Sequence, residues 1–232
     1  MKTIGLLGGM SWESTQSYYR AVNEGVKEAL GGLHSAKVIL YSVDFAEIEK
    51  LQHRGDWEKT AEILSEAARV VERAGADFLI ICTNTMHKVA PEIGEAISIP
   101  VLHIVDATAD ALEKDGINRV GLMGTKFTME QPFYRSRLEE MYDIAVVVPN
   151  EKERRTVHDI IYRELCLGEI REESRERLLV IIGGLEKKGA EAVILGCTEI
   201  ALLVKQEHTG VLLYDTTAIH AQKAVEMALE RN

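Results

Sequence analysis

Cysteine, proline and aromatic residues are scarce in this sequence, and each shortage excludes a kind of protein. The chain contains 3 cysteines and 4 prolines, and aromatic residues make up 6% of it. Three cysteines without a CxxC pair do not make a disulfide framework, so the sequence predicts free thiols in a reducing cytoplasm. No proline- or serine-rich stretch marks a linker between domains.

Long hydrophobic runs and an excess of positive charge are also absent. The apolar runs have strand length, well short of the roughly 20 residues that span a bilayer as a helix. The 37 acidic and 27 basic residues give a formal net charge of −10, which would repel a phosphate backbone. The stretch that begins at Met1 lacks the features of a signal peptide. We therefore expect a cytoplasmic protein with no membrane or nucleic-acid partner.

Two short stretches that resemble each other organise the rest of the chain. The first runs from Phe78 to Thr85 and the second from Ala192 to Glu199. Each is an apolar run that ends in small, nucleophilic or hydrogen-bonding residues, which is typical of a strand buried on both faces of a parallel sheet. Open α/β sheets bind ligands at the carboxyl ends of their strands, so we expect the chemistry at these two ends.

Other landmarks of the first half recur in the second half at nearly equal offsets, which indicates an internal duplication. The run 4–9 is echoed by 120–125, and the run 101–106 by 211–215. Alternating strands and helices imply parallel sheets with helical crossovers. The predicted fold is α/β, with two pseudo-symmetric lobes, each a parallel sheet flanked by helices, and an active site between the lobes. The expected lobes are residues 1–98 plus 210–232, and residues 99–209.

Apolar spacing also predicts individual elements. The first helix is expected to bury Tyr19, Val22, Val26 and Leu30 and to be capped by Ser14 or Thr15. Further helices are expected at about 57–74, 130–142, 151–166, 171–188 and 218–230, and a strand at 99–104.

Cys197 lies between Gly196 and Thr198, at a predicted strand end and a predicted helix start. A helix N-terminus stabilises a thiolate and lowers its pKa below the free value of about 8.5. The N–H groups there can also hold a carboxylate. A free cysteine is often only a small buried hydrophobe, but the Gly-Cys-Thr-Glu context favours a functional role.

The first stretch leaves two residues open for the equivalent role. Cys82 and Thr83 are adjacent, so on a strand their side chains point to opposite sides and only one can face a ligand. Either Cys82-Thr83 or Thr83-Asn84 can be aligned with Cys197-Thr198, and spacing alone does not choose.

Three motifs resemble the aspartate/glutamate racemase family, and the resemblance covers the whole chain. They are Gly-Gly-Met-Ser-Trp-Glu-Ser-Thr at 8–15, Cys-Thr-Asn-Thr-Met-His-Lys at 82–88 and Gly-Cys-Thr-Glu-Ile at 196–200. The resemblance implies two pseudo-symmetric lobes with the site between them, and two cysteines that act as acid and base without pyridoxal phosphate or metal. Members often form dimers, so a homodimer is a further expectation.

The resemblance also implies which residues act. Most members read Cys-Asn-Thr, and aligning Asn84-Thr85 with that motif puts Thr83 at the catalytic position. The chain then resembles the branch with a threonine/cysteine pair, which acts mainly on L-aspartate and L-glutamate, and Cys82 would point into the core. The substrate contacts that it implies are Met10, Gln52, Asn84, Thr85, Thr125 and Thr198, with Gln52 reading the side-chain carboxylate. Helix capping is an equally good role for Thr125.

The departure from a cysteine pair has a chemical consequence. A thiolate is a base near neutral pH and a threonine hydroxyl is not, so we expect Cys197 to be the base and Thr83, with water, the proton donor on the other face. Two alternatives stay open: an isomerase, racemase or decarboxylase of another small carboxylate, or an acidic-metabolite binding protein without turnover. No HExxH or GxGxxG pattern occurs, so no metal and no cofactor is expected.

Overall fold

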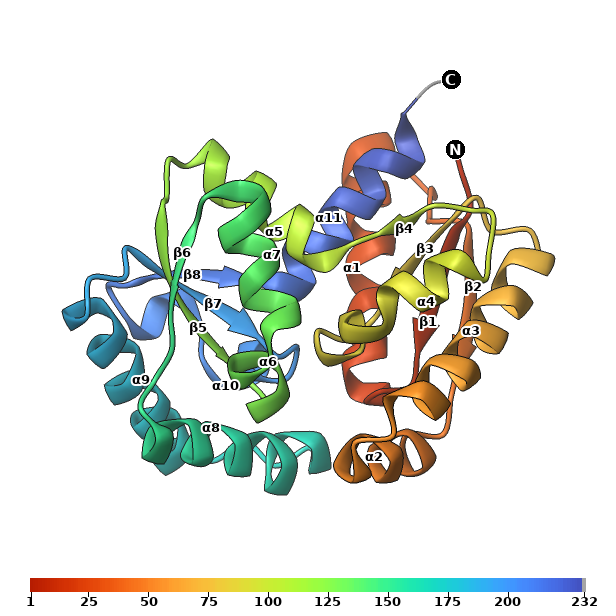
Figure 1. Ribbon diagram of the computed structural model, residues 1–232. Helices are drawn as coiled ribbons and strands as arrows, with labels where there is room; N and C mark the ends of the chain where they lie inside the picture. The colour runs from red at the N-terminus through yellow and green to blue at the C-terminus, as the bar shows by residue number, and fades with distance from the viewer. Residues whose placement is uncertain (231–232) are drawn as a thin grey trace. The chain divides into compact units, whose positions relative to one another are not determined.

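The predicted buried strands form two parallel sheets of four strands each (Figure 1). The strand order is β2-β1-β3-β4 in one sheet and β6-β5-β7-β8 in the other. Because the two sheets have the same order relative to the chain, the second half repeats the topology of the first. The prediction of an α/β fold with two pseudo-symmetric lobes is therefore confirmed. The computed structural model describes residues 1–230.

The first unit comprises Met1–Ile104 and the chain from His220 onward. Its elements are β1 (Ile4–Gly8), α1 (Trp12–Leu30), β2 (Val38–Ser42), α2 (Phe45–Arg54), α3 (Trp57–Arg73), β3 (Phe78–Ile81), the 3-10 helix η1 (Thr85–Val89), α4 (Ala90–Glu95), β4 (Val101–Leu102) and most of α11 (Thr216–Leu229).

Alternate residues of the central strands face two helical layers. Leu6 and Ile80 pack against α1 and α11, whereas Leu7 and Ile81 pack against α3 and α4. This follows from the two-residue period of a strand, and it explains why the strands are apolar throughout. In Figure 1 the blue α11 lies beside the red α1, as this packing requires.

The second unit comprises Val105–Ile219. Its elements are α5 (Ile104–Lys114), β5 (Arg119–Gly124), α6 (Lys126–Glu130), α7 (Pro132–Tyr142), β6 (Ala145–Val147), α8 (Glu151–Arg163), the 3-10 helix η2 (Leu165–Leu167), α9 (Glu172–Lys187), β7 (Ala192–Gly196), α10 (Ile200–Leu203), the 3-10 helix η3 (Gln206–His208) and β8 (Leu212–Asp215).

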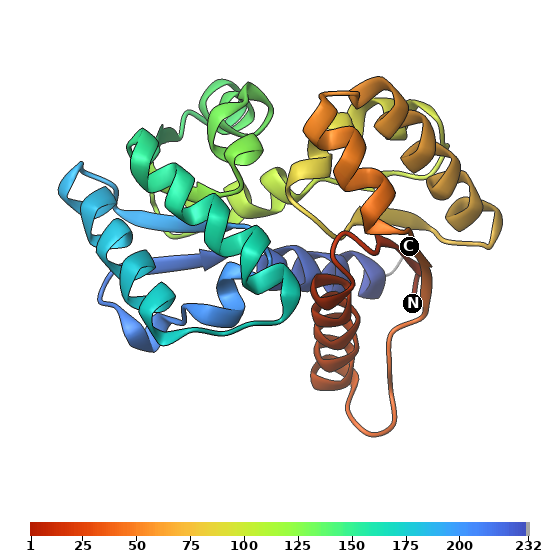
Figure 2. The same ribbon diagram turned by 90° about the horizontal axis from the view of Figure 1, so that it is seen from below.

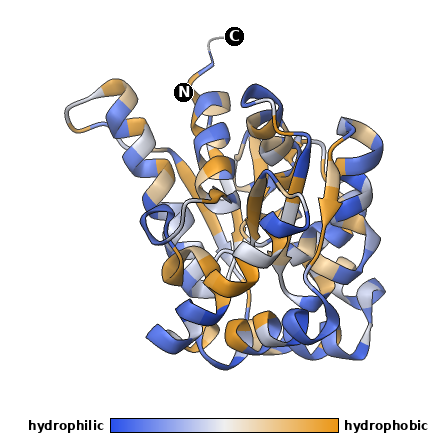
Figure 3. Cartoon of the chain, turned by 90° about the vertical axis from the view of Figure 1, so that its left-hand side faces the viewer, coloured by the Kyte–Doolittle hydropathy of each residue, from blue (hydrophilic) through white to orange (hydrophobic). Residues whose placement is uncertain are grey.

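The core of this unit has the same construction. Val193 and Leu195 of β7 pack against Val157 and Ile161 of α8 and Leu178 of α9. Figure 3 shows the hydrophobic colour concentrated on the strands and the hydrophilic colour on the outer faces of the helices. None of the described helices is both long and apolar enough to cross a membrane.

The chain passes from the first unit to the second after Ile104 and returns after Ile219. Our expected points were near Ile99 and Gly210. The first passage falls at the start of α5 and the second inside α11. A passage within a regular helix has no glycine, proline or change of composition to mark it, so the sequence does not reveal it.

Two details of α1 differ from the prediction. Tyr19 is 52% exposed and Leu30 is 46% exposed, and the buried aromatic residue is Tyr18. The helical period fits Tyr18 as well as Tyr19, so the spacing could not decide which of two adjacent faces of α1 is buried. The cap is Ser11, whose hydroxyl accepts a hydrogen bond from the Ser14 N–H at 3.3 Å.

Other element boundaries also differ from the prediction. The strand expected at 99–104 is only Val101–Leu102, because α5 begins at Ile104. The helix expected at 130–142 begins only at Pro132, the first residue of α7, and the separate helix α6 ends before it at Glu130. The segment 45–54, for which no helix was predicted above, is helix α2, so Gln52 lies inside a helix.

Candidate active site

Each sheet contains a point at which the strand order reverses. In the first unit the chain proceeds outward from β1 to β2, then returns to place β3 on the other side of β1. The same reversal separates β5 from β7. The loops at such a point diverge and leave a crevice at the carboxyl ends of the strands. The β3 and β7 ends, which carry Thr83 and Cys197, therefore lie at equivalent positions of the two units.

The end of β7 carries a thiol that is hydrogen bonded to a carboxylate. The Cys197 Sγ donates to Glu199 Oε2 at 2.9 Å, and the Thr198 hydroxyl donates to the same oxygen at 2.7 Å. The exposed fractions of Cys197 and Glu199 are 7% and 3%. Glu199 thus accepts hydrogen bonds from the side chains of Cys197 and Thr198 in a buried setting, where hydrogen bonds to a charged group are strong.

The electrostatics of Cys197 are opposite to our prediction. Burial, the Glu199 carboxylate and the nearby Cys166 raise the pKa of the Cys197 thiol well above its ordinary value. We expected a helix N-terminus to lower this pKa, but α10 has only 4 residues and begins at Ile200. Burial and the adjacent negative charge together outweigh such a short dipole. The resting residue is therefore a thiol with a proton acceptor already in contact.

The neighbouring loop of this unit brings Thr125 close to Cys197 along the sheet. Gly124 pairs with Gly196, and the two side chains follow directly in sequence. A Cβ on Gly196 would stand 3.0 Å from the Met123 carbonyl oxygen, so glycine is required there for the strands to approach. Thr125 is buried, and its hydroxyl caps α6 by accepting from the Thr128 N–H at 3.3 Å.

The end of β3 presents Thr83 and buries Cys82. Cys82 has no exposed surface and packs in the cluster that includes Ile80 and Tyr18, so our expectation that it points into the core is confirmed. Burial raises the pKa of this thiol, and its carbonyl accepts a hydrogen bond from the Ser14 hydroxyl at 3.1 Å. Thr83 is partly exposed at the strand end.

The other residues that we predicted in the first unit are buried. Asn84 and Thr85 are 2% and 5% exposed and begin the turn into η1. Met10 is 3% exposed and belongs to the cluster packed on α3. Gln52 is 1% exposed in the last turn of α2. Met10 therefore packs in the core of this unit, and Gln52 is buried within α2.

Sequence reasoning missed two residues near Cys197. Glu199 was part of the quoted motif, but we assigned it no role, although a carboxylate two positions from a thiol was a usable signal. Thr217 was not singled out at all. It is 5% exposed, and its Oγ1 has no hydrogen-bond partner among residues 1–230. Thr217 follows β8, which pairs with β7, so an unsatisfied hydroxyl lies at the same edge of the sheet.

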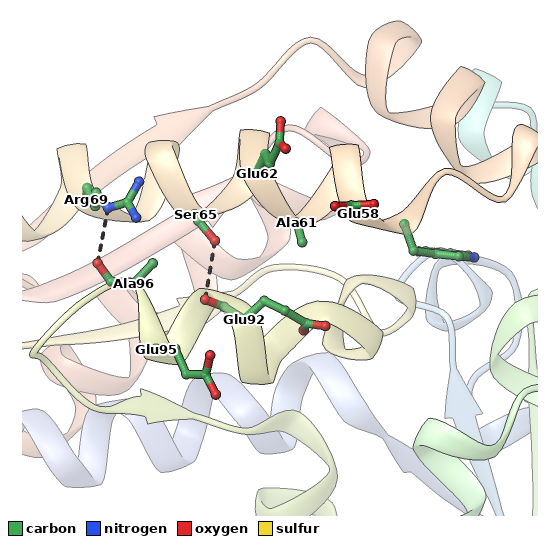
Figure 4. A pocket seen from close by; sticks show the side chains of 9 residues that line it. Glu58, Ala61, Glu62, Ser65, Arg69, Glu92, Glu95 and Ala96 are labelled. Carbon is green, nitrogen blue, oxygen red and sulfur yellow. Dashed lines mark hydrogen bonds between the residues drawn. The ribbon is translucent and has the colours of Figure 1, made fainter.

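A surface pocket in the first unit lies away from these strand ends, between α3 and α4 (Figure 4). The Ser65 hydroxyl donates to the Glu92 carbonyl oxygen at 3.4 Å, and the Arg69 Nε donates to the Ala96 carbonyl oxygen at 3.2 Å. Its lining also contains three further glutamates, Glu58, Glu62 and Glu95. Such a rim repels anions, so this pocket does not suit an acidic ligand. Among residues 1–230, no group of three or more His, Cys, Asp or Glu side chains is placed to hold a metal ion.

Together, these features define a class of protein. It is a duplicated α/β protein in which equivalent strand ends of the two units carry a hydroxyl and a thiol with a carboxylate partner. The chain belongs to the Asp/Glu/hydantoin racemase family, whose model matches residues 7–224.

Individual relatives agree with this assignment. A Yersinia pestis protein with a provisional Asp/Glu racemase assignment is 54% identical, with a TM-score of 0.92 over 99% of this chain and 100% of that one. An aspartate racemase homologue from Pyrococcus horikoshii is 38% identical, with a TM-score of 0.86 over 99% of this chain and 100% of that one.

A curated relative matches over a shorter region. The broad-specificity amino-acid racemase RacX of Bacillus subtilis is 26% identical over 141 residues, which are 59% of this chain and 60% of RacX. The match thus spans less than two thirds of that relative's length.

Proposed function

We propose that this protein is an amino-acid racemase that interconverts the enantiomers of aspartate, glutamate or both without a cofactor. Cys197 and Thr83 would exchange protons with opposite faces of the substrate α-carbon. Family membership supports the reaction class. The observation that carries the mechanism is the Cys197–Glu199 hydrogen bond of 2.9 Å, because it supplies the acceptor that a neutral thiol needs to become a base.

The first step of the proposed mechanism activates the thiol. Glu199 takes the Cys197 proton, and the thiolate then removes the substrate α-proton, so that one C–H bond breaks and one S–H bond forms. When the proton passes from Cys197 to Glu199, the negative charge moves from the carboxylate to the sulfur, and the net charge of the pair stays the same. This suits a buried site, where separating charge is costly.

The second step returns a proton to the opposite face. The Thr83 hydroxyl gives its proton to the α-carbon, which leaves an alkoxide. The proton that Glu199 accepted then reaches Thr83 through water, and all three groups regain their resting states. A hydroxyl is a far weaker acid than a thiol, so this half of the cycle limits the rate.

The predicted binding residues fit this scheme chemically. We propose that Asn84, Thr85 and Thr198 hold the α-carboxylate with neighbouring backbone N–H groups, because hydroxyl and amide donors suit an anion. Thr125 and Met10 would complete the wall of the site, and Gln52 would contact the side-chain carboxylate. Short strand-end loops can present several donors to one small ligand.

The equilibrium constrains what unequal residues can do. The two enantiomers have equal free energy in solution, so kcat/KM must be the same in both directions. The asymmetry between Cys197 and Thr83 can therefore appear only in kcat and KM separately. We expect the protein to turn over slowly when Thr83 acts as the base.

Exchange in deuterated water tests the proposal. L-aspartate and L-glutamate are incubated separately with the protein, and α-deuterium and the D-enantiomer are followed by NMR and chiral chromatography. Deuterium in the inverted product supports the racemase. Binding without exchange would show an acidic-metabolite binding protein instead, and exchange only with other acids would show a different substrate.

Replacing Thr83 with cysteine is expected to accelerate racemisation. A thiol is a better acid and base than a hydroxyl near neutral pH, so kcat should rise on the order of 10²-fold in the direction in which residue 83 removes the proton. Initial rates from each enantiomer measure the effect. Thr83→Val keeps the volume but should abolish inversion. An unchanged Thr83→Cys enzyme, together with an inactive Cys82→Ala variant, would show that Cys82 is the acting residue.

We also propose a cytoplasmic homodimer. Large apolar side chains are exposed on α1, the loop after it and β2, and Figure 2 shows this loop leading from α1 back to β2. Leu33 is fully exposed, and Leu40 of the edge strand β2 is 46% exposed. Exposed apolar patches commonly mark association sites. Sedimentation velocity of the wild type and of Leu33→Lys measures this; a monomeric wild type would contradict it.

A further inference from the structure

His87 connects the candidate catalytic turn to the end of the sheet. It lies in η1 and is 2% exposed. Its Nδ1 lies 2.8 Å from the Thr83 carbonyl oxygen, and its Nε2 lies 3.1 Å from the Ile104 nitrogen. The imidazole thus bridges two backbone groups that are far apart in the chain and follow neighbouring strands, β3 and β4.

The chemistry of the two partners determines the tautomer. A backbone N–H only donates, so Nε2 must be the unprotonated, accepting nitrogen. A carbonyl oxygen only accepts, so Nδ1 must carry the proton and donate to Thr83. Only a neutral imidazole in the Nδ1–H form satisfies both contacts. A protonated ring would lose the bond to Ile104.

The surroundings of His87 favour this neutral form. Burial, His103 and His220 lower the pKa of His87 well below its ordinary value. The His103 ring is 4.5 Å from the His87 ring, and the His220 ring is 5.8 Å away. The Tyr18 hydroxyl lies 2.9 Å from the His220 Nδ1, and the His220 Nε2 lies 2.8 Å from the Leu102 carbonyl oxygen. These surroundings disfavour a positive charge on the His87 ring itself.

The bond to Thr83 determines how the turn presents its groups. The peptide between Thr83 and Asn84 is a rigid plane, and its carbonyl and N–H point in opposite directions. When His87 holds the carbonyl, the Asn84 N–H is directed to the other side, and the rotation of Thr83 about its backbone is restricted. We infer that His87 is a positioning residue, which orients the Thr83 hydroxyl and the Asn84 N–H toward the substrate. This inference rests on the proposed function.

Three substitutions separate the two contacts of His87. In His87→Asn the amide nitrogen takes the place of Nδ1 and can still donate to Thr83. In His87→Gln the longer amide reaches the place of Nε2 and can still accept from Ile104, but the Thr83 bond is lost. His87→Phe keeps the ring volume and loses both bonds. The matched control is His220→Phe, which removes a buried histidine that is bonded to Tyr18 and to the Leu102 carbonyl.

The expected result is a pattern across these variants. Racemisation by the Phe and Gln variants should fall about 10²-fold in kcat, with KM changed less, because a small misplacement of a reacting group has that effect. The Asn variant and His220→Phe should stay within a few-fold of the wild type. Thermal unfolding of each variant separates loss of activity from loss of folding.

Two outcomes would overturn the inference. One is a Gln variant as active as the Asn variant, and the other is a His220→Phe variant as impaired as His87→Phe. If the wild type itself neither racemises nor exchanges, the proposed function fails instead. In that case, ¹⁵N NMR of the histidines still decides the structural claim: an Nδ1–H tautomer of His87 supports it, and an Nε2–H tautomer refutes it.

Discussion

Replacing Cys197 with serine should lower racemisation about 10³-fold or more. The substitution keeps the hydrogen bond to Glu199 but raises the pKa of the reacting group far above that of a thiol, so the competent base is lost. Conversion of L-aspartate and L-glutamate to the D-enantiomers, followed by chiral chromatography, measures the loss. Exchange of the α-proton in deuterated water should disappear with it, since both depend on the same proton removal.

The other two cysteines provide matched controls for this result. Cys166 lies close enough to Cys197 to influence the pKa of its thiol, yet it is only partly buried on η2. Cys166→Ser should therefore retain racemisation, and Cys82→Ala should retain it in the fraction that folds. If activity survived in Cys197→Ser and vanished in Cys166→Ser, the reacting thiol would be that of Cys166, and our mechanism would be refuted.

Glu199→Gln is expected to have the second largest effect. The amide has the same shape but cannot accept the thiol proton as a carboxylate does, so kcat should fall on the order of 10²-fold with KM changed less. Steady-state kinetics in both directions measure this, and the two values of kcat/KM should fall together.

The rate at which the Cys197 thiol is alkylated should rise in Glu199→Gln, although kcat falls. Glu199 raises the pKa of Cys197 through its negative charge. Removing that charge lowers the pKa toward its ordinary value, increases the thiolate fraction near neutral pH and accelerates the reaction with iodoacetamide. In the wild type, alkylation should rise with pH throughout the neutral range, because the raised pKa leaves the thiol mostly protonated there. Faster alkylation with undiminished racemisation would show that Glu199 only tunes the thiol and takes no proton.

Much of the fold could be predicted because its signals are local. The runs Phe78–Ile81 and Ala192–Gly196 are apolar throughout, which is the pattern of a strand covered by helices on both faces. The duplication could be recognised because equivalent strands recur at similar offsets along the sequence. The buried face of α1 could not be predicted, since a helix that contains both Tyr18 and Tyr19 has two overlapping apolar stripes.

The candidate site could be predicted only in part. Thr83 follows the end of β3 and Cys197 follows the end of β7, and the sequence was enough to place them there. The bond from His87 to Ile104 was not foreseeable, because it joins segments brought together only by the pairing of β3 with β4. The unsatisfied hydroxyl of Thr217 likewise follows from its burial in the folded unit.

The order of strands and helices, the twofold repetition and the positions of the reactive side chains at strand ends were all determined by the linear pattern of residues. Tertiary structure alone decided the protonation state of Cys197 and the orientation of the Thr83 carbonyl. The reason is physical: periodicity depends on neighbours along the chain, whereas a pKa or a hydrogen bond depends on which groups the folded chain brings within a few ångströms.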